Sequence, residues 1–306
     1  MAGVTEAEIM NESPVARKLP PLLRAMRPLQ WTKNSLVFAP LLFDRRVFQP
    51  ASFWRSVAAA IVFCLVSSAI YLINDVRDVE ADRFHPKKRL RPIAAGEITE
   101  RTAIFTALGL FAVGLAAAFL IRPQFSLIVL GYIVLMLAYT WQLKALVLLD
   151  VFTIAVGFVL RAAGGGAAIA VPISPWLYVC TMLGALFIGF GKRRHELESL
   201  EGSAGNHRAN LDDYSLQLLD QIIAIISSAI LMAYSLYTFD ASNVPDNHAM
   251  MLTIPFVLYA LFRYLYLIYQ KKEGGSPEVL LITDRPMLFC IVSWGLSSGV
   301  ILYLTR

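Results

Sequence analysis

The amino-acid sequence predicts an all-α protein that crosses a membrane many times, with its helices packed in one bundle. Hydrophobic residues make up 57% of the 306 residues and charged residues only 16%, and the mean hydropathy is +0.60. Soluble domains carry about 25% charged residues, so water is not the main solvent of this chain. Long apolar runs also recur along the whole sequence, separated by short polar segments.

The apolar runs of adequate length give nine candidate membrane spans. They are residues 29–43, 53–73, 101–121, 125–141, 145–163, 175–191, 216–239, 249–270 and 286–304. The first run is short, and basic residues among leucines and prolines precede it. We interpret residues 1–28 as a cytoplasmic and interfacial lead-in and residues 29–306 as a single nine-helix transmembrane domain.

The distribution of basic residues predicts the orientation of the bundle. Most of the 27 Lys and Arg residues fall on segments that lie on the inner side if the N-terminus is cytoplasmic. The outer segments carry Arg45, Arg46, Arg55, Arg122 and Arg306, and two further arginines fall within spans. Because positive charge collects on the inner side, we expect the N-terminus inside and the C-terminus outside, in the inner (plasma) membrane of a bacterium.

This basic inner face also explains the net charge of +5. It suits anionic lipid and phosphorylated substrates, and the sequence lacks the alternating aromatic and basic residues of a nucleic-acid module. We therefore expect the lipid bilayer as a partner and no nucleic acid. The sequence leaves open whether the protein forms a homo-oligomer.

The most informative polar residues come directly after the second predicted span. They are Asn74, Asp75, Asp78 and Asp82. In a continuous helix, the three aspartates share one face, and Arg77 points away from them. Like charges on one face repel each other unless a cation lies between them, and Mg²⁺ binds such oxygens together with substrate phosphates. The pattern predicts a site for Mg²⁺, or alternatively Mn²⁺; a solvated helix end is the other interpretation.

Basic residues follow this motif immediately. Lys87, Lys88, Arg89 and Arg91 stand around two prolines. Alone, such a segment is an ordinary basic loop on the inner side of a membrane protein. Beside a row of carboxylates it matches the needs of a diphosphate, whose oxygens are bridged by metal ions and neutralised by Lys or Arg.

A second polar segment lies between the sixth and seventh spans and contains Lys192, Arg193 and Glu196. One interpretation is a basic turn that contacts anionic lipid. The alternative is a second wall of the same site, where Lys192 and Arg193 bind phosphate and Glu196 orients a metal ion or a substrate hydroxyl. Asp212 and Asp213, later in this loop, leave a second acidic motif open.

Two arginines, Arg161 and Arg263, fall within predicted spans, where a charged group normally faces a cavity or a partner. The nearest acid on the same helix face as Arg161 is Asp150, and we interpret Gly164-Gly165-Gly166 as a break that ends this helix. A second set of substrate-binding candidates consists of Tyr71, Arg161, Glu196, Arg263, Asp284 and Arg285.

Cysteine and histidine residues give no sign of a metal site or a catalytic triad. Cys64, Cys180 and Cys290 each lie within a predicted span, far apart in sequence, and we expect them to pack as small apolar residues. The four histidines are scattered, so neither a zinc site nor a Ser-His-Asp arrangement is predicted.

The motif Asn74-Asp75-x-x-Asp78-x-x-x-Asp82, followed by Arg91-Pro92-Ile93-Ala94-Ala95-Gly96, resembles the UbiA superfamily of intramembrane prenyltransferases over essentially the whole chain. Within that superfamily, the segments that resemble phosphoribosyltransferases acting on decaprenyl phosphate are Trp31-Thr32-Lys33-Asn34, Gly191-Lys192-Arg193, Pro277-Glu278 and Asp284-Arg285. The resemblance implies a UbiA-type bundle around a cavity that opens at the cytoplasmic side.

The same resemblance implies a function. We expect Mg²⁺-dependent transfer of 5-phosphoribose from phosphoribosyl diphosphate to a polyprenyl phosphate, with release of diphosphate and inversion at C1. The product would serve the synthesis of a cell-wall arabinan precursor or a related lipid-linked sugar. Asp75, Asp78 and Asp82 would act as the catalytic metal ligands, with Asn74 as a neutral ligand. The residues expected to bind phosphate oxygens are Lys33, Lys87, Arg91, Lys144, Lys192 and Arg193.

Two alternatives remain open at this point. Aromatic prenyltransferases of the superfamily usually carry a second aspartate-rich motif where this chain has Gly191-Lys192-Arg193, a change that fits a site with more phosphate to neutralise. A prenyltransferase that uses a prenyl diphosphate nevertheless shares the first motif. A non-enzymatic transporter is the second alternative, although such proteins typically show internal repeats, and we find no repeat here.

Overall fold

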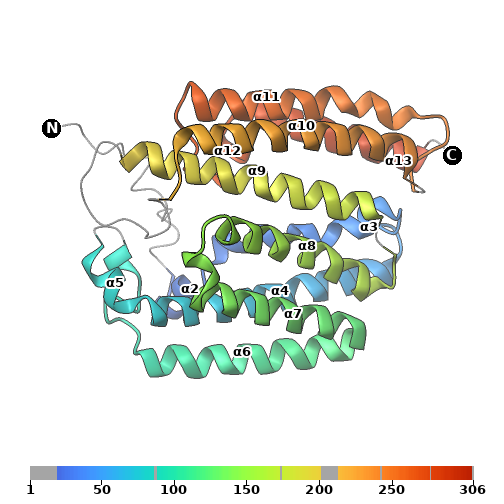
Figure 1. Cartoon of the computed structure of the whole chain (residues 1–306). Coiled ribbons are helices and arrows are strands. Elements are labelled where there is room, and N and C mark those ends of the chain that lie inside the picture. Colours follow the sequence, from blue (N-terminus) through green and yellow to red (C-terminus); the bar gives the residue numbers. More distant parts are fainter. Residues whose placement is uncertain are drawn as a thin grey trace.

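The computed structural model describes residues 19–85, 88–172, 174–200, 213–241, 243–275 and 277–304. These residues form α-helices and 3₁₀ helices and no strand, as Figure 1 shows. Within them, 8 helices are long and apolar enough to cross a membrane. They are α4 (Pro50–Arg77), α6 (Glu100–Ile121), α7 (Pro123–Trp141), α8 (Leu149–Ile169), α9 (Pro175–Leu200), α10 (Leu216–Asp240), α11 (Ile254–Tyr269) with its lead-in η5 (Ala249–Thr253), and α13 (Arg285–Leu304). The predicted all-α membrane fold is confirmed.

Short elements connect these helices. They are α2 (Pro21–Ala25), η2 (Pro28–Phe38), α3 (Ala39–Phe43), α5 (Val79–Phe84), η3 (Lys88–Leu90), η4 (Leu143–Ala145) and α12 (Pro277–Thr283). Cys64, Cys180 and Cys290 are free thiols; Cys290 is buried, and Cys64 and Cys180 are half-buried.

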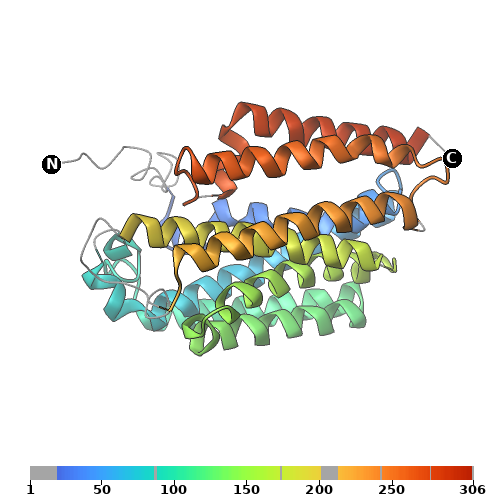
Figure 2. The same cartoon turned by 45° about the horizontal axis from the view of Figure 1, so that its top comes forward.

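The long helices lie side by side in layers (Figures 1 and 2). Helices α4 and α8 occupy the centre; α6 and α7 pack on one side of them, α9 and α10 on the other, and α11 and α13 form an outer layer. In the most apolar part of α4 and of α8, 56% of the residues are buried, compared with 17% in α6. Polar side chains on α4 and α8 are therefore shielded from lipid by the other helices.

The two ends of the bundle differ in chemistry. At one end, which we call the acidic end, α4 finishes beside the end of α7, and Arg77 donates a hydrogen bond of 3.1 Å to the Trp141 carbonyl. Arg77 thus points away from the aspartates, as predicted. At the far end, where α8 finishes, Arg46 donates to the Ile169 carbonyl at 3.5 Å.

The first predicted span, residues 29–43, is not an α-helix. It forms η2 followed by α3, because Pro40 has no amide hydrogen to donate within an α-helix that would continue through it. The segment nevertheless runs the length of the bundle, since Arg27 contacts Asp75 at the acidic end and Arg46 contacts Ile169 at the far end. At a rise of about 2.0 Å per residue in η2 and about 1.5 Å in α3, the two elements extend roughly 30 Å, the thickness of a hydrocarbon core.

The prediction that Gly164-Gly165-Gly166 ends its helix is wrong. Helix α8 continues through these glycines to Ile169. A Cβ on Gly165 would lie 2.1 Å from the Val37 carbonyl oxygen, so η2 packs directly against the backbone of α8. The glycines therefore provide a close helix contact, which a side chain at this position would prevent.

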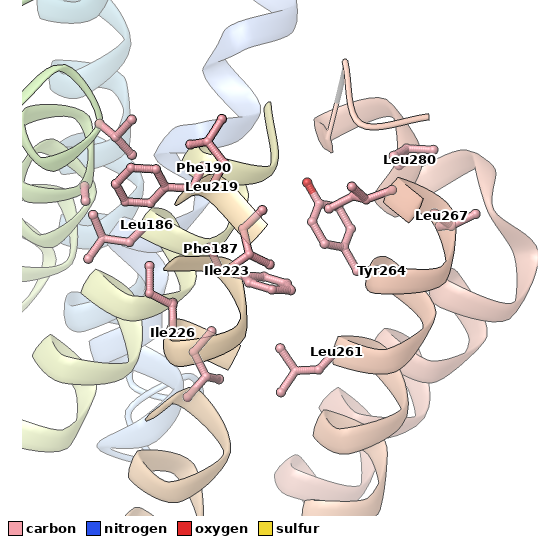
Figure 3. Close-up of a cluster of buried hydrophobic side chains, with 14 of the residues drawn as sticks. Leu186, Phe187, Phe190, Leu219, Ile223, Ile226, Leu261, Tyr264, Leu267 and Leu280 are labelled. Carbon is pink, nitrogen blue, oxygen red and sulfur yellow. The ribbon is translucent and has the colours of Figure 1, made fainter. Parts of the chain in front are cut away.

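The outer layer is joined to the bundle by apolar side chains. Figure 3 shows Phe187 of α9 and Ile223 of α10 on one side, and Leu261 and Tyr264 of α11 on the other. The Phe187 and Tyr264 ring centroids lie 5.1 Å apart. Burial of these groups stabilises the packing of α11 against α9 and α10.

A cavity of about 1210 Å³ lies toward the far end. Its lining comes from Phe38, Leu41, Leu177, Tyr234 and Trp294, among others, and is mostly apolar. It therefore lies away from the acidic motif. The cavity expected at the cytoplasmic side stays a prediction.

Candidate active site

The acidic motif lies across the junction of α4 and α5. Helix α4 ends at Arg77, and α5 begins at Val79 after the capping residue Asp78. The Asp82 amide donates to the Asp78 carbonyl at 2.8 Å, so the chain keeps its helical direction. Asp75 and Asp82 face the same side, as the periodicity predicted, but Asp78 caps the junction and does not share their contact with Arg91.

One guanidinium joins these two carboxylates. Arg91 Nη1 lies 3.2 Å from Asp75 Oδ1 and 2.6 Å from Asp82 Oδ2. Asp78 occupies a different position, where Lys144 Nζ lies 2.5 Å from its Oδ1 and Asn74 Nδ2 donates to its Oδ2 at 3.3 Å. The structure thus places Arg91 beside Asp75 and Asp82, and Lys144 beside Asp78.

Sequence reasoning missed Arg27 as a member of this site. Its guanidinium pairs with Asp75 and lies over the ring of Tyr71, with its Cζ 4.9 Å from the ring centroid. Arg27 has φ 54°, a left-handed conformation uncommon outside glycine, directly before Pro28. The sequence alone does not distinguish Arg27 from the other arginines of the lead-in segment. The turn before η2 brings Arg27 to Asp75.

The carboxylates and cations at the acidic end balance one another. Asp75, Asp78 and Asp82 meet Arg27, Arg91 and Lys144, which come from three separate segments of the chain. These cations keep 27%, 26% and 21% of their side-chain surface exposed, respectively, whereas Asp75 and Asp82 are buried. The cations are therefore the part of this cluster that a ligand reaches most readily.

Burial raises the pKa of Asp82, and the neighbouring Arg91 guanidinium opposes that shift. A further positive charge nearby would stabilise the ionised form of a carboxylate in these surroundings. The atoms that could coordinate a metal ion here are carboxylate oxygens and the amide oxygen of Asn74. Mg²⁺ prefers oxygen ligands of this kind.

Within the described residues, no three His, Cys, Asp or Glu side chains converge closely enough to hold a metal ion by themselves. Mg²⁺ usually binds through one or two carboxylates together with substrate phosphates and water. The residues present fit that kind of shared site.

A second group of charges lies where α9 ends. Arg193 Nε donates to Asp150 Oδ2 at 2.7 Å, and Arg193 also pairs with Glu196. Tyr214 donates to the other oxygen of Asp150 at 3.1 Å and accepts a hydrogen bond of 2.6 Å from the Leu148 amide. Burial raises the pKa of Tyr214 to about 12, so it stays protonated as a donor.

The remaining charges on α9 also connect helices. Arg194 lies 2.7 Å from Asp220 of α10 and 2.9 Å from Glu198, and its Cζ is 4.4 Å from the ring centroid of Tyr269 on α11. Lys192 is half-buried on the same helix. Arg193 and Arg194 therefore already bind carboxylates that hold α8, α9 and α10 together.

The other candidates are dispersed. Arg263 pairs with Asp284 through two hydrogen bonds of 3.1 and 2.8 Å, and Arg285 is exposed at the start of α13. The Asp284 pKa is lowered by the hydrogen bond from Arg263. Arg161 contacts Asn34 and Tyr132, whereas Asp150, its nearest acid in sequence, pairs with Arg193.

Two predicted positions need separate mention. Lys33 is half-buried on η2, next to the buried Asn34. Lys87 and Asp212 lie outside the described residues, as does the side chain of Glu278.

Comparisons with known proteins agree with the fold and with the family resemblance. The model of the UbiA prenyltransferase family matches residues 38–283. A decaprenyl-phosphate phosphoribosyltransferase of Mycobacterium tuberculosis is 34% identical over 292 residues, which cover 94% of this chain and 96% of that protein. The protein of the same name from Corynebacterium glutamicum is 34% identical over 280 residues, 89% of this chain and 84% of that protein.

A solved structure is similar over nearly the same length. A UbiA homolog from Archaeoglobus fulgidus bound to GPP and Mg²⁺ superposes with a TM-score of 0.71 and 19% sequence identity, covering 92% of this chain and 99% of the other. At this identity the likeness shows a common fold. Together with the apolar helices, it identifies this chain as an integral membrane protein.

Proposed function

Because this chain belongs to the UbiA prenyltransferase family, we propose that it is a polyprenyl-phosphate phosphoribosyltransferase. It transfers 5-phosphoribose from phosphoribosyl diphosphate to a polyprenyl phosphate such as decaprenyl phosphate and releases diphosphate. The observation that carries this proposal is the cluster of buried carboxylates matched by partly exposed cations at the acidic end. Relatives that share about a third of its residues over nearly their whole length bear the name of this activity.

Asp75, Asp78 and Asp82, with Asn74, would hold Mg²⁺ together with the donor diphosphate. The ion, when bound, neutralises charge on the diphosphate oxygens. Structures of family members with Mg²⁺ or Cd²⁺ support the use of a divalent metal, and Mg²⁺ is the ion we propose.

With a metal ion and its diphosphate held at the carboxylates, Arg27, Arg91 and Lys144 would be released from their present partners. We propose that they then turn toward phosphate oxygens of the donor. Negative charge grows on the leaving diphosphate as the bond from ribose C1 lengthens, and these cations stabilise it. Lys33, Lys87 and Lys192 are further proposed phosphate ligands, while Arg193 and Glu196 stay paired as part of the site wall.

The acceptor phosphate attacks C1 from the face opposite the diphosphate, so a single displacement inverts C1. A phosphate monoester has a second pKa near about 6 and is already ionised at neutral pH. No side chain is needed to remove a proton from it. This agrees with the absence of a histidine from the charge cluster of the described residues.

We further propose that the acidic end faces the cytoplasm of a bacterial plasma membrane. The donor is soluble in water, and the basic segments collect at this end. The lipid-linked phosphoribose would then enter the synthesis of a cell-wall arabinan precursor or a related lipid-linked sugar.

The test uses purified protein in detergent with phosphoribosyl diphosphate, a polyprenyl phosphate and Mg²⁺. We expect mass spectrometry to detect polyprenyl phosphoribose, with equal release of diphosphate. If product formed instead from a prenyl diphosphate and an aromatic acceptor, the result would contradict this proposal and support an aromatic prenyltransferase. Release of no diphosphate from either donor would contradict both enzymatic functions.

A further inference from the structure

Deep in the bundle, three helical segments meet at one buried guanidinium. Arg161 of α8 donates from Nε to Asn34 Oδ1 of η2 at 2.8 Å and from Nη2 to the Tyr132 hydroxyl of α7 at 2.6 Å. Its Cζ lies 4.8 Å from the ring centroid of Tyr132 and 5.1 Å from that of Phe158. Only 6% of Arg161 and 2% of Asn34 are exposed.

The charge of this guanidinium has no counter-ion among the described residues, because no carboxylate there forms an ion pair with it. The other arginines buried to a similar degree, Arg193 and Arg194, each pair with two carboxylates. Arg161 Nη1 also donates to no described acceptor. A buried cation normally has a charged partner, so this one is suited to bind an anion that the described residues do not supply.

The guanidinium lies on the membrane side of the acidic motif. Side chains lean toward the N-terminus of their helix, and in α8 that end is the acidic end. Arg161 follows this rule, since its Nη1 lies 3.7 Å from the position of a Cβ on Gly157, one turn earlier. Gly157 follows Asp150 by about two turns, or roughly 10 Å along α8.

Aromatic residues lie between the two sites. Tyr71, which packs under Arg27 one turn before Asp75, is within electrostatic range of the Tyr132 hydroxyl. Tyr132 in turn contacts Arg161. A molecule bound at the acidic motif and one bound at Arg161 would therefore be neighbours, the second deeper in the membrane.

We propose that Arg161, oriented by Asn34 and Tyr132, binds the phosphate of the polyprenyl acceptor. This inference rests on the proposed function and names the acceptor site. A lipid phosphate comes from the bilayer, so its site lies deeper than that of the water-soluble donor. The neutral partners of Arg161 orient its planar group without cancelling its charge, which leaves that charge for a phosphate.

The experiment measures binding directly, without turnover. Wild-type protein and Arg161→Met are titrated in detergent with a short-chain prenyl monophosphate, with the prenyl alcohol of the same chain length and with phosphoribosyl diphosphate. Loss of hydrogen bonds to a charged group predicts about tenfold or greater weakening for the monophosphate. Binding of the alcohol and of phosphoribosyl diphosphate should not change.

Arg122→Met is the matched control, because Arg122 is half-buried at the far end and donates only to the Ala167 carbonyl at 3.4 Å. It should bind all three compounds as the wild type does. If Arg161→Met does not yield folded protein, Arg161→Lys keeps the charge but not the planar fork, and we expect several-fold weaker binding of the monophosphate.

Three results would overturn the proposal. They are unchanged monophosphate binding by the Arg161 variants, equal loss of alcohol binding, and no monophosphate binding by the wild type. Arg161-dependent binding of the monophosphate by a wild type that never releases diphosphate would support this site and contradict the proposed transferase. The two claims can therefore fail separately.

Discussion

The α4–α5 motif and the charged part of α9 both place arginines against carboxylates, yet they differ in how firmly the pairs are held. Around Asp75, Asp78 and Asp82 the cations come from three segments and keep about a quarter of their surface exposed. Arg193 of α9 is 5% exposed and its partner Asp150 of α8 is 0% exposed. Tyr214 donates a further hydrogen bond to Asp150. Exposed pairs contribute little to stability, whereas breaking a buried pair costs several kcal/mol. The first group is therefore suited to exchange partners with a ligand, and the second to hold helices together.

The strongest way to break this comparison is Asp75→Asn. The change removes a carboxylate that we propose binds metal, while the side chain keeps its size. We expect diphosphate release by the folded protein to fall by about a hundredfold or more. The control is Asp44→Asn at the far end, where Asp44 pairs with Arg46 at 2.5 Å. Wild-type turnover by Asp75→Asn would exclude Asp75 as an essential ligand.

The next largest effect is expected from Asp150→Asn, measured by thermal unfolding in detergent. Arg193 would lose the charge of its one buried partner and keep the partly exposed Glu196, at a cost of about 3 kcal/mol. The protein should melt at a lower temperature, and the molecules that remain folded should keep their apparent affinity for phosphoribosyl diphosphate. If this variant melted like the wild type and lost donor binding, the roles assigned to the two groups would be reversed.

Lys144→Met tests the exchange of partners at the acidic motif. Lys144 is 21% exposed, so its pair with Asp78 contributes little to folding. Loss of a charge-assisted hydrogen bond to phosphate should raise the KM for phosphoribosyl diphosphate by about tenfold. Steady-state kinetics at saturating acceptor measures this, and a change in the acceptor KM alone would place Lys144 elsewhere.

The smallest expected effect is a pH dependence that sharpens the role of Asp82. Because burial raises its pKa, protons compete with a metal ion at higher pH than they would at an ordinary aspartate. The Mg²⁺ concentration for half-maximal diphosphate release should rise as the pH falls toward the pKa of Asp82. In the metal-free protein the sign for stability is the reverse: the protonated form favours folding, and this contribution is lost as the pH rises through the folded pKa. Asp82→Asn should remove the added pH dependence of the Mg²⁺ requirement.

Local patterns in the sequence predicted much of the fold. Apolar length identified the helices, and helical spacing placed Asp75 and Asp82 on one face. The same rules failed where contacts between distant segments determine the local structure. Pro40 turned an expected α-helix into two shorter elements, and Gly165 serves a contact with Val37 that no local pattern reveals.

The partners in the candidate site were harder to predict than its carboxylates. Arg27 lies 48 positions from Asp75, and Asn34 lies 127 positions from Arg161. Such pairs depend on where η2 packs along α4 and α8. This position is set by tertiary packing and cannot be read from local sequence. The periodicity of α8 suggested Asp150 for Arg161, but Arg193 arrives from α9 and takes that carboxylate.

The contact between Gly165 and η2 has a consequence for the spacing of the two substrates. Arg27 directly precedes η2, and Asn34 lies within it. One segment therefore carries the side chain that pairs with Asp75 and the side chain that accepts a hydrogen bond from Arg161. A methyl group at position 165 would push against a carbonyl that cannot turn aside. The whole segment would then shift, and Arg27 and Asn34 would move away from Asp75 and Arg161, the residues that we propose help to bind donor and acceptor.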